Sequence, residues 1–304
     1  MSYLFRILSC LIVLMVLNNA LIGQYDPENE VVTILKYHLK PLSEVDDGSA
    51  AERKEVFEEY ARKMNPLSTK LKSAMTLGHY WTGSSQDIIA VNRWKSIADA
   101  DESVVTTQEV RKRAWRRDDL REEFMKKYNK YWTGRHDDLE VLELLYGYTK
   151  NRKRKPKENT VVTIVRRYMA PLSTVEDGSA EERKELWEEW FENITVENDK
   201  LLSQMILRHY WSGTYNPREE TPIVIIREYV SMADADDGGW DEPLEQYWPD
   251  EDTREENLAK FFRYWLGKHE DIGYEYLKNF FNKDVVEPIK YHVLAKRYLA
   301  KEKK

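Results

Sequence analysis

Hydrophobic and polar positions follow one recurring pattern along this chain. A run of β-branched residues at 31–35 predicts a strand. Ser49 then stands three residues before Glu52, which is the spacing of a capping box. In this motif the serine side chain accepts a hydrogen bond from a free N–H of the first helical turn, and the glutamate side chain accepts one from the backbone N–H of the serine. Apolar residues recur at a 3.6-residue period over 56–64, so this helix is expected to bury one face against a flat partner.

Two further strands and a second helix are predicted downstream. Alternate positions of the first strand share one face: Met75, Leu77, His79 and Trp81. The next strand passes through residues 88–91, and the second helix carries an apolar stripe: Leu120, Phe124, Tyr128 and Trp132. Gly134 follows, where a left-handed helix cap forms most easily. A short fourth strand is expected, and residues 288–294 are one candidate in the second series.

The whole pattern occurs twice. Residues 31–60 and 161–190 share 18 identities in 30 positions without a gap. Three shorter blocks match in the same order: 79–83 with 209–213, 96–101 with 231–236, and 131–138 with 264–271. Four collinear matches indicate an internal duplication. We therefore predict two units, residues 24–150 and 161–304, joined by a basic polar linker at 151–160.

The element order is that of a ferredoxin-like (β-α-β-β-α-β) unit, in which both helices cover one face of an antiparallel sheet. The other face is left bare and apolar, so it needs a partner. We predict an α+β fold in which two tandem ferredoxin-like units pack sheet to sheet as an intramolecular pseudo-dimeric barrel.

The amino terminus predicts export. Arg6 precedes the apolar run 7–17, and small residues follow, as in a cleavable secretory signal. We expect residues 1–23 to be removed by cleavage near Gly23. Asn18 and Asn19 interrupt the run before it reaches the roughly 20 apolar residues of a membrane anchor. A periplasmic or extracellular protein without a stable membrane anchor is therefore expected.

Composition narrows the chemistry further. Cys10 is the only cysteine and lies within the predicted signal, so the mature chain has neither disulfides nor thiolate ligands. The net charge of -7 argues against a general nucleic-acid binder, which carries a basic surplus. Aromatic residues make up 12% of the chain and either fill a core or line a ligand cavity.

The two copies differ in charge at one place. Residues 103–117 are mainly basic, whereas the corresponding residues 238–252 are mainly acidic. Opposite charges at matched positions would pair the two units or steer self-association between molecules. Attraction between exposed groups is weak and is screened over about 8–10 Å in physiological salt.

On its element order, its duplication and its His-Tyr-Trp and His-acid-Asp blocks, the chain resembles the dimeric α+β barrel superfamily in a fused, tandem-repeat form. The likeness spans residues 31–300 and is greatest to exported bacterial members of unassigned function. The superfamily includes cofactor-free monooxygenases, haem-dependent enzymes, stress-response proteins and small-ligand sensors, so the resemblance selects no function. No catalytic motif of a particular branch matches, and the resemblance assigns no catalytic residue.

Matched histidines are the first candidates for a site. His79 and His209 share predicted strand faces with Trp81 and Trp211. If that face lines the barrel, two imidazoles could approach each other and bind a ligand, ligate haem or act as a base near neutral pH. The alternative is that each is a structural histidine hydrogen-bonded beside a tryptophan, and a duplicated structural residue is copied as readily as a functional one.

A second matched set follows the second helix. It consists of His136 and Asp138 in the first copy and His269 and Asp271 in the second. Histidine with carboxylates suggests a metal site or a His–Asp pair, but adjacent residues seldom converge on one ion. Stabilisation of a helix C-terminus by a cation is the simpler interpretation, and we predict no metal site.

Three classes of function therefore remain. The first is an exported module, without a recognisable catalytic set, that binds a small apolar or aromatic ligand in its barrel. The second is an oxygenase-like or haem-dependent oxidoreductase that uses the barrel histidines. The third is a structural or interaction protein whose barrel is filled by its own side chains. No residue pattern in the sequence requires a cofactor, and haem is the cofactor that the second class of function would use.

Overall fold

The computed structural model describes residues 30–79, 86–153, 158–209 and 220–276. Eight strands form one closed antiparallel barrel in the order β1-β3-β2-β8-β5-β7-β6-β4. The strands are β1 (Val31–Leu39), β2 (Leu71–His79), β3 (Asp87–Trp94), β4 (Trp132–Leu144), β5 (Val161–Met169), β6 (Leu201–His209), β7 (Thr221–Tyr229) and β8 (Trp265–Tyr276). The predicted α+β class is confirmed.

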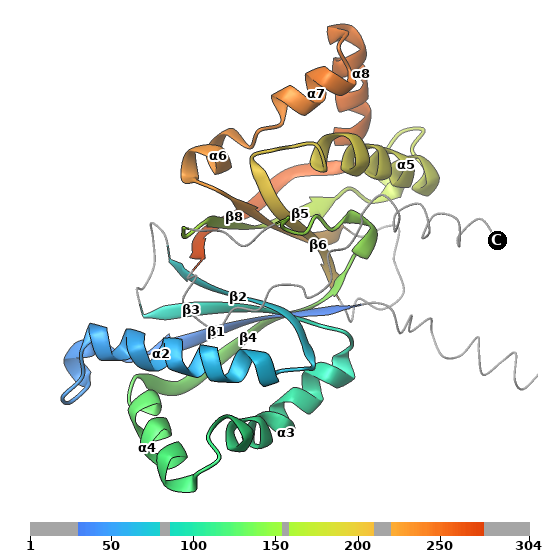
Figure 1. Cartoon of the computed structure of the whole chain (residues 1–304). Coiled ribbons are helices and arrows are strands. Elements are labelled where there is room, and N and C mark those ends of the chain that lie inside the picture. The colour runs from blue at the N-terminus through green and yellow to red at the C-terminus, as the bar shows by residue number, and fades with distance from the viewer. Residues whose placement is uncertain (1–29, 80–85, 154–157, 210–219, 277–304) are drawn as a thin grey trace, which may run out of the picture.

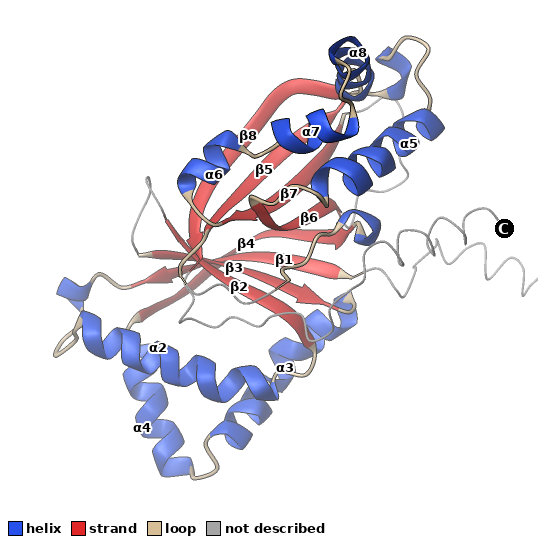
Figure 2. Ribbon diagram, turned by 45° about the horizontal axis from the view of Figure 1, so that its top comes forward, coloured by secondary structure: helices blue, strands red, loops and turns tan. Residues whose placement is uncertain are grey.

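Helices lie on two opposite sides of the strands (Figures 1 and 2). In the first half of the chain, residues 30–150, they are α2 (Ala50–Met64), α3 (Ile97–Ala114) and α4 (Asp118–Asn129). In the second half, residues 158–276, they are α5 (Ala180–Trp190), α6 (Met232–Asp237), α7 (Asp241–Tyr247) and α8 (Glu251–Phe262), and a π-helical turn, Phe191–Thr195, continues α5. Among the described helices, none has the length and apolar character that crossing a bilayer demands.

The barrel closes where the edges of the two four-stranded groups meet. β4 pairs with β6 through Leu142↔His209 to Leu144↔Leu207. β2 pairs with β8 through Leu77↔Tyr276 to His79↔Tyr274. Because both seams are hydrogen-bonded, the described strands leave no free edge of the kind that invites aggregation.

Inside the barrel, aliphatic side chains from seven of the eight strands form one buried cluster. Its members are Val32, Ile34, Leu77, Ile89, Val91, Leu142, Leu144, Val162, Met205, Leu207, Val224 and Ile226. Their alternation along each strand follows the period of two that places every second residue on the inner face. The sequence predicted a ligand here, but the described interior is occupied by the protein's own side chains.

The predicted capping serines are confirmed. Ser49 Oγ accepts a hydrogen bond from Glu52 N, and Ser179 Oγ accepts one from Glu182 N. The glutamates do not reach back to the helix start: Glu52 Oε2 instead accepts a hydrogen bond from Tyr131 Oη at 2.6 Å. The capping box thereby ties the start of α2 to the segment that enters β4.

The fourth strands lie elsewhere than expected. Trp132, which was predicted to end the second helix, is the first residue of β4, and Trp265, at the matched position of the second copy, is the first residue of β8. Gly134 does have a positive φ, +78°, but lies within β4 instead of capping a helix. The candidate strand at 288–294 lies outside the described residues, and α3, which pattern alone did not predict, fills 97–114.

The predicted linker begins inside the fold. Asn151 Oδ1 accepts a hydrogen bond from Arg93 Nη1 at 3.2 Å, and Arg152 pairs with Glu228, which is fully buried. Lys153, in contrast, is exposed. The start of the segment therefore packs against both halves of the chain.

The basic residues at the end of α3 make local contacts. Lys112 pairs with Glu109, Arg117 pairs with Asp119, and the Arg111 guanidinium lies 5.9 Å from the Tyr60 ring. No ion pair of the described residues joins them to the acidic segment of α7, on the other side of the barrel. Pairing between the two units by these charges is thus wrong, while self-association stays a prediction.

Candidate functional site

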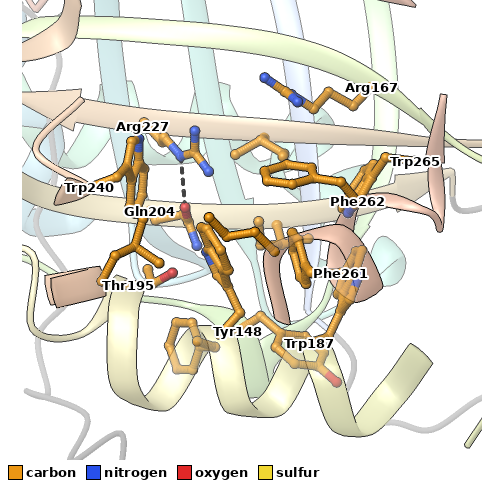
Figure 3. Close-up of a pocket in the computed structure, with 16 residues that line it drawn as sticks. Tyr148, Arg167, Trp187, Thr195, Gln204, Arg227, Trp240, Phe261, Phe262 and Trp265 are labelled. Carbon is orange, nitrogen blue, oxygen red and sulfur yellow. Dashed lines mark hydrogen bonds between the residues drawn. The ribbon is translucent and has the colours of Figure 1, made fainter. Parts of the chain in front are cut away.

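A cavity of about 290 Å³ lies in the second half of the chain, between the outer face of strands β5–β7 and the helices above them (Figure 3). Eight aromatic residues line it: Tyr148, Trp187, Trp190, Phe191, Trp240, Phe261, Phe262 and Trp265. The remaining lining residues are Ile206, Ile225, Leu244, Leu258, Arg167, Thr195, Gln204 and Arg227. The cavity is outside the barrel, in the layer between sheet and helices.

Helix periodicity places the aromatic wall. Trp187 and Trp190 are three residues apart on α5 and therefore share a face. Trp187 stacks on Trp265 with ring centroids 5.2 Å apart, and Trp190 stacks on Phe261 at 4.4 Å. These stacks fix flat apolar surfaces around the cavity.

Two indole N–H groups at this wall are buried without a hydrogen-bond partner in the described structure. They are Nε1 of Trp187 and Nε1 of Trp265. A buried donor that lacks an acceptor costs about 1–3 kcal/mol. Trp115 and Trp132 of the first half are in the same state, so these donors reflect the packing of aromatic rings and do not indicate a ligand.

A glycine pair places Trp240 over the cavity. Gly238 and Gly239 have φ values of 72° and 66°, which side chains with a Cβ rarely adopt. Asn198 Nδ2 donates a hydrogen bond of 2.8 Å to Gly238 O and thereby holds this turn. Trp240 then lies 4.6 Å from the guanidinium carbon of Arg227, whose Nε donates to Gln204 Oε1 at 2.8 Å.

Arg167 reaches the cavity from β5 (Figure 3). Within the described structure its side chain has neither a hydrogen bond nor an ion pair with an acidic residue. Its cross-strand neighbour on β8 is His269, and directly paired residues share one face of a sheet. His269 is exposed and lies outside the cavity lining, so register brings this predicted residue only to the neighbourhood of the site.

The predicted histidine pair is not brought together. His79, half-buried at the end of β2, and His209, exposed at the end of β6, lie four positions apart in the eight-stranded ring. Strands four apart in a fully antiparallel ring run in the same direction. The two imidazoles therefore lie at one end of the barrel but on opposite walls, and their role in ligand binding stays a prediction. Trp81 and Trp211 lie outside the described residues.

The residues of the second predicted set lie on the strands that follow the second helices, and not at the helix ends. His136 is exposed on β4, with Nε2 3.7 Å from Asp138 Oδ1 and its ring 5.8 Å from that of Tyr37. Asp271 pairs through its backbone with Val165 on β5. Over the described residues, no three histidine, cysteine, aspartate or glutamate side chains gather as a metal site would require.

One polar cluster was missed from the sequence. His38 Nδ1 lies 2.8 Å from Asp87 Oδ1, and its Nε2 lies 3.0 Å from Asp137 Oδ2. Burial acts to raise the pKa of Asp87, but hydrogen bonds from Lys36 and His38 outweigh it and lower that pKa. The second copy has Tyr168 in place of His38, so a search for matched residues could not find this cluster.

The cavity was likewise not predicted: some of its residues, such as Trp187 and Trp190, were expected to form the buried face of a helix, and the others were assigned no role. Their available signal was a difference between copies. Arg167 and Arg227 stand where the first copy has Tyr37 and Asn92. A charged residue that occurs in only one copy, at a strand position that faces the helices, indicates that the layer between strands and helices differs between the two copies.

No family model matches this chain, and no curated protein matches it. Among solved structures, it is similar to a candidate monooxygenase from Fusobacterium nucleatum, with 10% identity, a TM-score of 0.47, and coverage of 84% of this chain and 94% of that one. A candidate monooxygenase from Lactobacillus acidophilus gives 11% identity, a TM-score of 0.45, and coverage of 84% and 100%.

A chlorite dismutase variant from Candidatus Nitrospira defluvii gives 9% identity, a TM-score of 0.42, and coverage of 88% and 94%. These neighbours are of the dimeric α+β barrel, ferredoxin-like kind. At such identities and scores the likeness assigns no chemistry to this chain, and the strand pairing alone carries the description of its fold.

Proposed function

We propose that this protein binds a small aromatic or apolar ligand in the cavity of its second half. The observation that carries the proposal is a wall of eight aromatic residues around about 290 Å³, with two arginine side chains among the remaining lining residues. Small-molecule sites are typically concave and mostly apolar, with a few polar groups that set orientation. This volume lies near the lower end of the ~300–1,000 Å³ range of such sites, which suits a ligand of two or three rings.

Two finer statements belong to the same proposal. The duplicated units act as one intramolecular pseudo-dimer, since each half supplies four strands and the ring closes only when both are present. The protein acts after export and cleavage near Gly23, as the amino-terminal pattern predicts. Tyr148, which lines the cavity, comes from the end of the first half, so the site depends on the fusion of the units.

Haem-dependent chemistry is less well supported by the residues of this cavity. Its described lining contains neither histidine nor cysteine, and Tyr148 is the lining residue of a type that ligates haem iron. The barrel histidines stand on opposite walls, beside an interior filled by aliphatic groups. The lining therefore does not fit a histidine-ligated haem.

The second candidate function is that of a structural or interaction protein, because the barrel is filled by the protein's own side chains.

Titration with the neutral fluorophore N-phenyl-1-naphthylamine distinguishes ligand binding from this structural function. We expect enhanced fluorophore emission, quenched tryptophan emission and one site per chain. If the mature protein gives no saturable signal, the ligand-binding proposal is wrong and the structural class is preferred.

A blocking variant locates the binding. Ile225 is buried on β7 and lines the cavity, so Ile225→Trp fills it and should weaken fluorophore binding at least about tenfold. Val230→Trp, at an exposed position just after β7, is the matched control and should bind as the parent does. Circular dichroism and the unfolding midpoint confirm that both variants fold.

A further inference from the structure

Two cations lie on the strand side of the cavity. Register places Arg167 opposite Ile223, and Thr163 opposite Arg227, on neighbouring strands. The two arginines are thus offset by four residues along the strands, about 13 Å between their backbones. Figure 3 shows both extending from the strands, with Trp187 facing them from α5. The apolar middle of the cavity therefore has a guanidinium toward each end.

The two guanidinium groups differ in their surroundings. Arg227 donates to Gln204 and lies over the Trp240 ring, so part of its donor capacity is used. The Arg167 side chain has no acidic partner in the part of the chain that the structure describes, and no acidic residue lines the cavity there. A partly buried cation beside apolar rings is favourable only when an anion or water satisfies it.

Comparison with the first half indicates that the two arginines are not required for folding and favours a role for them in binding a ligand. The first copy builds the same strands and helices with neutral residues, Tyr37 and Asn92, at the two arginine positions. Tyr37 packs edge-on against Trp132, with ring centroids 5.7 Å apart. The fold itself therefore needs no cation at these positions, and both cations occur in the half that holds the cavity.

From this geometry we infer that the ligand is an acid: a flat aromatic or apolar body carrying a carboxylate or similar anionic group, which pairs with Arg167. The inference rests on the proposed function and specifies its ligand class. A guanidinium fork binds carboxylate through two parallel N–H···O bonds and so fixes orientation as well as charge. The ring system lies between the tryptophan stacks, and Arg227 with Gln204 bounds the opposite end.

Two fluorophores that share one ring system test the inference. N-phenyl-1-naphthylamine is neutral, and 8-anilino-1-naphthalenesulfonate carries the same rings with an anionic group. The measured quantity is the ratio of their dissociation constants at low salt, in the parent, Arg167→Met, Arg167→Lys and Lys268→Met. Lys268 is an exposed cation on the neighbouring strand β8 and serves as the matched control.

We expect Arg167→Met to weaken binding of the anionic probe at least about tenfold while leaving the neutral probe within about twofold. Arg167→Lys should retain part of the preference, because it keeps the charge but loses the fork. Lys268→Met should change neither probe. Ile225→Trp should reduce both probes equally, which shows that they occupy the cavity.

The two proposals fail differently. If the neutral probe binds the parent but Arg167→Met leaves the ratio unchanged, the acidic ligand class is wrong and the cavity remains a ligand site. If Arg167→Met weakens both probes alike, Arg167 shapes the wall without binding an anion, and the inference is again wrong. If neither probe binds the parent, the proposed function itself fails.

Discussion

In the first half of the chain, aromatic rings stack in the layer between strands and helices, and in the second half aromatic rings line a cavity there. In the first half, Trp115 stacks on Phe124 with centroids 4.4 Å apart. In the second half, Trp248 takes the place of Trp115, but Asn257 stands where Phe124 would supply the second ring. Neither Trp248 nor Asn257 lines the cavity, so the missing ring is a difference in packing beside the cavity and not an opening in its wall.

Helix continuity differs in the same region. The first half runs through α3 as one helix of 18 residues. The second half replaces it with α6 and α7, separated by the Gly238–Gly239 turn that directs Trp240 toward the cavity. The two halves therefore build the corresponding layer from different helices, and a cavity lies in the layer of the second half.

The largest expected difference between the halves is in stability. Phe57→Ala removes a ring that is 3% exposed and stacked on Trp132, and should cost about 3–5 kcal/mol of unfolding free energy. Trp187→Ala, at the matched position, removes a ring that already borders empty space and should cost about 1–2 kcal/mol. Denaturant unfolding of both variants measures the contrast. Equal costs would mean that the second layer is as tightly packed as the first.

Lys150 gives the next largest effect: it is the last residue of the first half, and its amine contacts the second half. Its Nζ donates to Thr195 O and Asn198 O, at 3.1 and 2.6 Å, at the end of the π-helical turn. Burial lowers the pKa of Lys150 to about 8. The first half instead closes this turn with Ser68 Oγ, which donates to Met64 O.

The direction in which stability changes with pH follows from the number of protons that the folded and unfolded states bind. Between pH 8 and the unfolded pKa of about 10.4, the unfolded state binds more protons at this site, so the contribution of Lys150 to stability rises with pH. Relative to Lys150→Met, the parent should gain up to about 3 kcal/mol between pH 7 and 10.5. The exposed Lys95→Met variant should show no such change against the parent. A flat difference for Lys150→Met would exclude a depressed amine pKa.

The smallest expected effect sharpens the comparison by restoring a ring. Asn257→Phe restores the ring that the first half has at the matched position and should raise the unfolding free energy by about 0.5–2 kcal/mol through added apolar contacts. The reciprocal variant, Phe124→Asn, should destabilise the first half and serves as the matched comparison. Should Asn257→Phe destabilise the protein, the missing ring is not what separates the two layers.

Local chemistry explains why part of the fold could be predicted. The β-branched runs at 31–35 and 161–165 form β1 and β5, and Ser49 and Ser179 cap their helices, because these preferences act over a few residues. The position of Trp132 differs from its prediction for a related reason. Phe124, Tyr128 and Trp132 keep helical spacing, but α4 ends at Asn129, where Tyr131 bonds Glu52 on α2 and turns the chain into β4.

The duplication, the α+β class and most of the helices and strands follow from the sequence alone. Each depends on the spacing of residues that are close together in the chain, and not on contacts with distant residues. Only the tertiary structure decided the rest. Strand pairing across the two halves closed the barrel, placed His79 and His209 on opposite walls and filled the interior with aliphatic groups. Packing of helices from residues 180–262 on strands from 161–229 created the cavity and brought Arg167 to it. Such contacts depend on side chains far apart in the chain, whose volumes and directions no local pattern records.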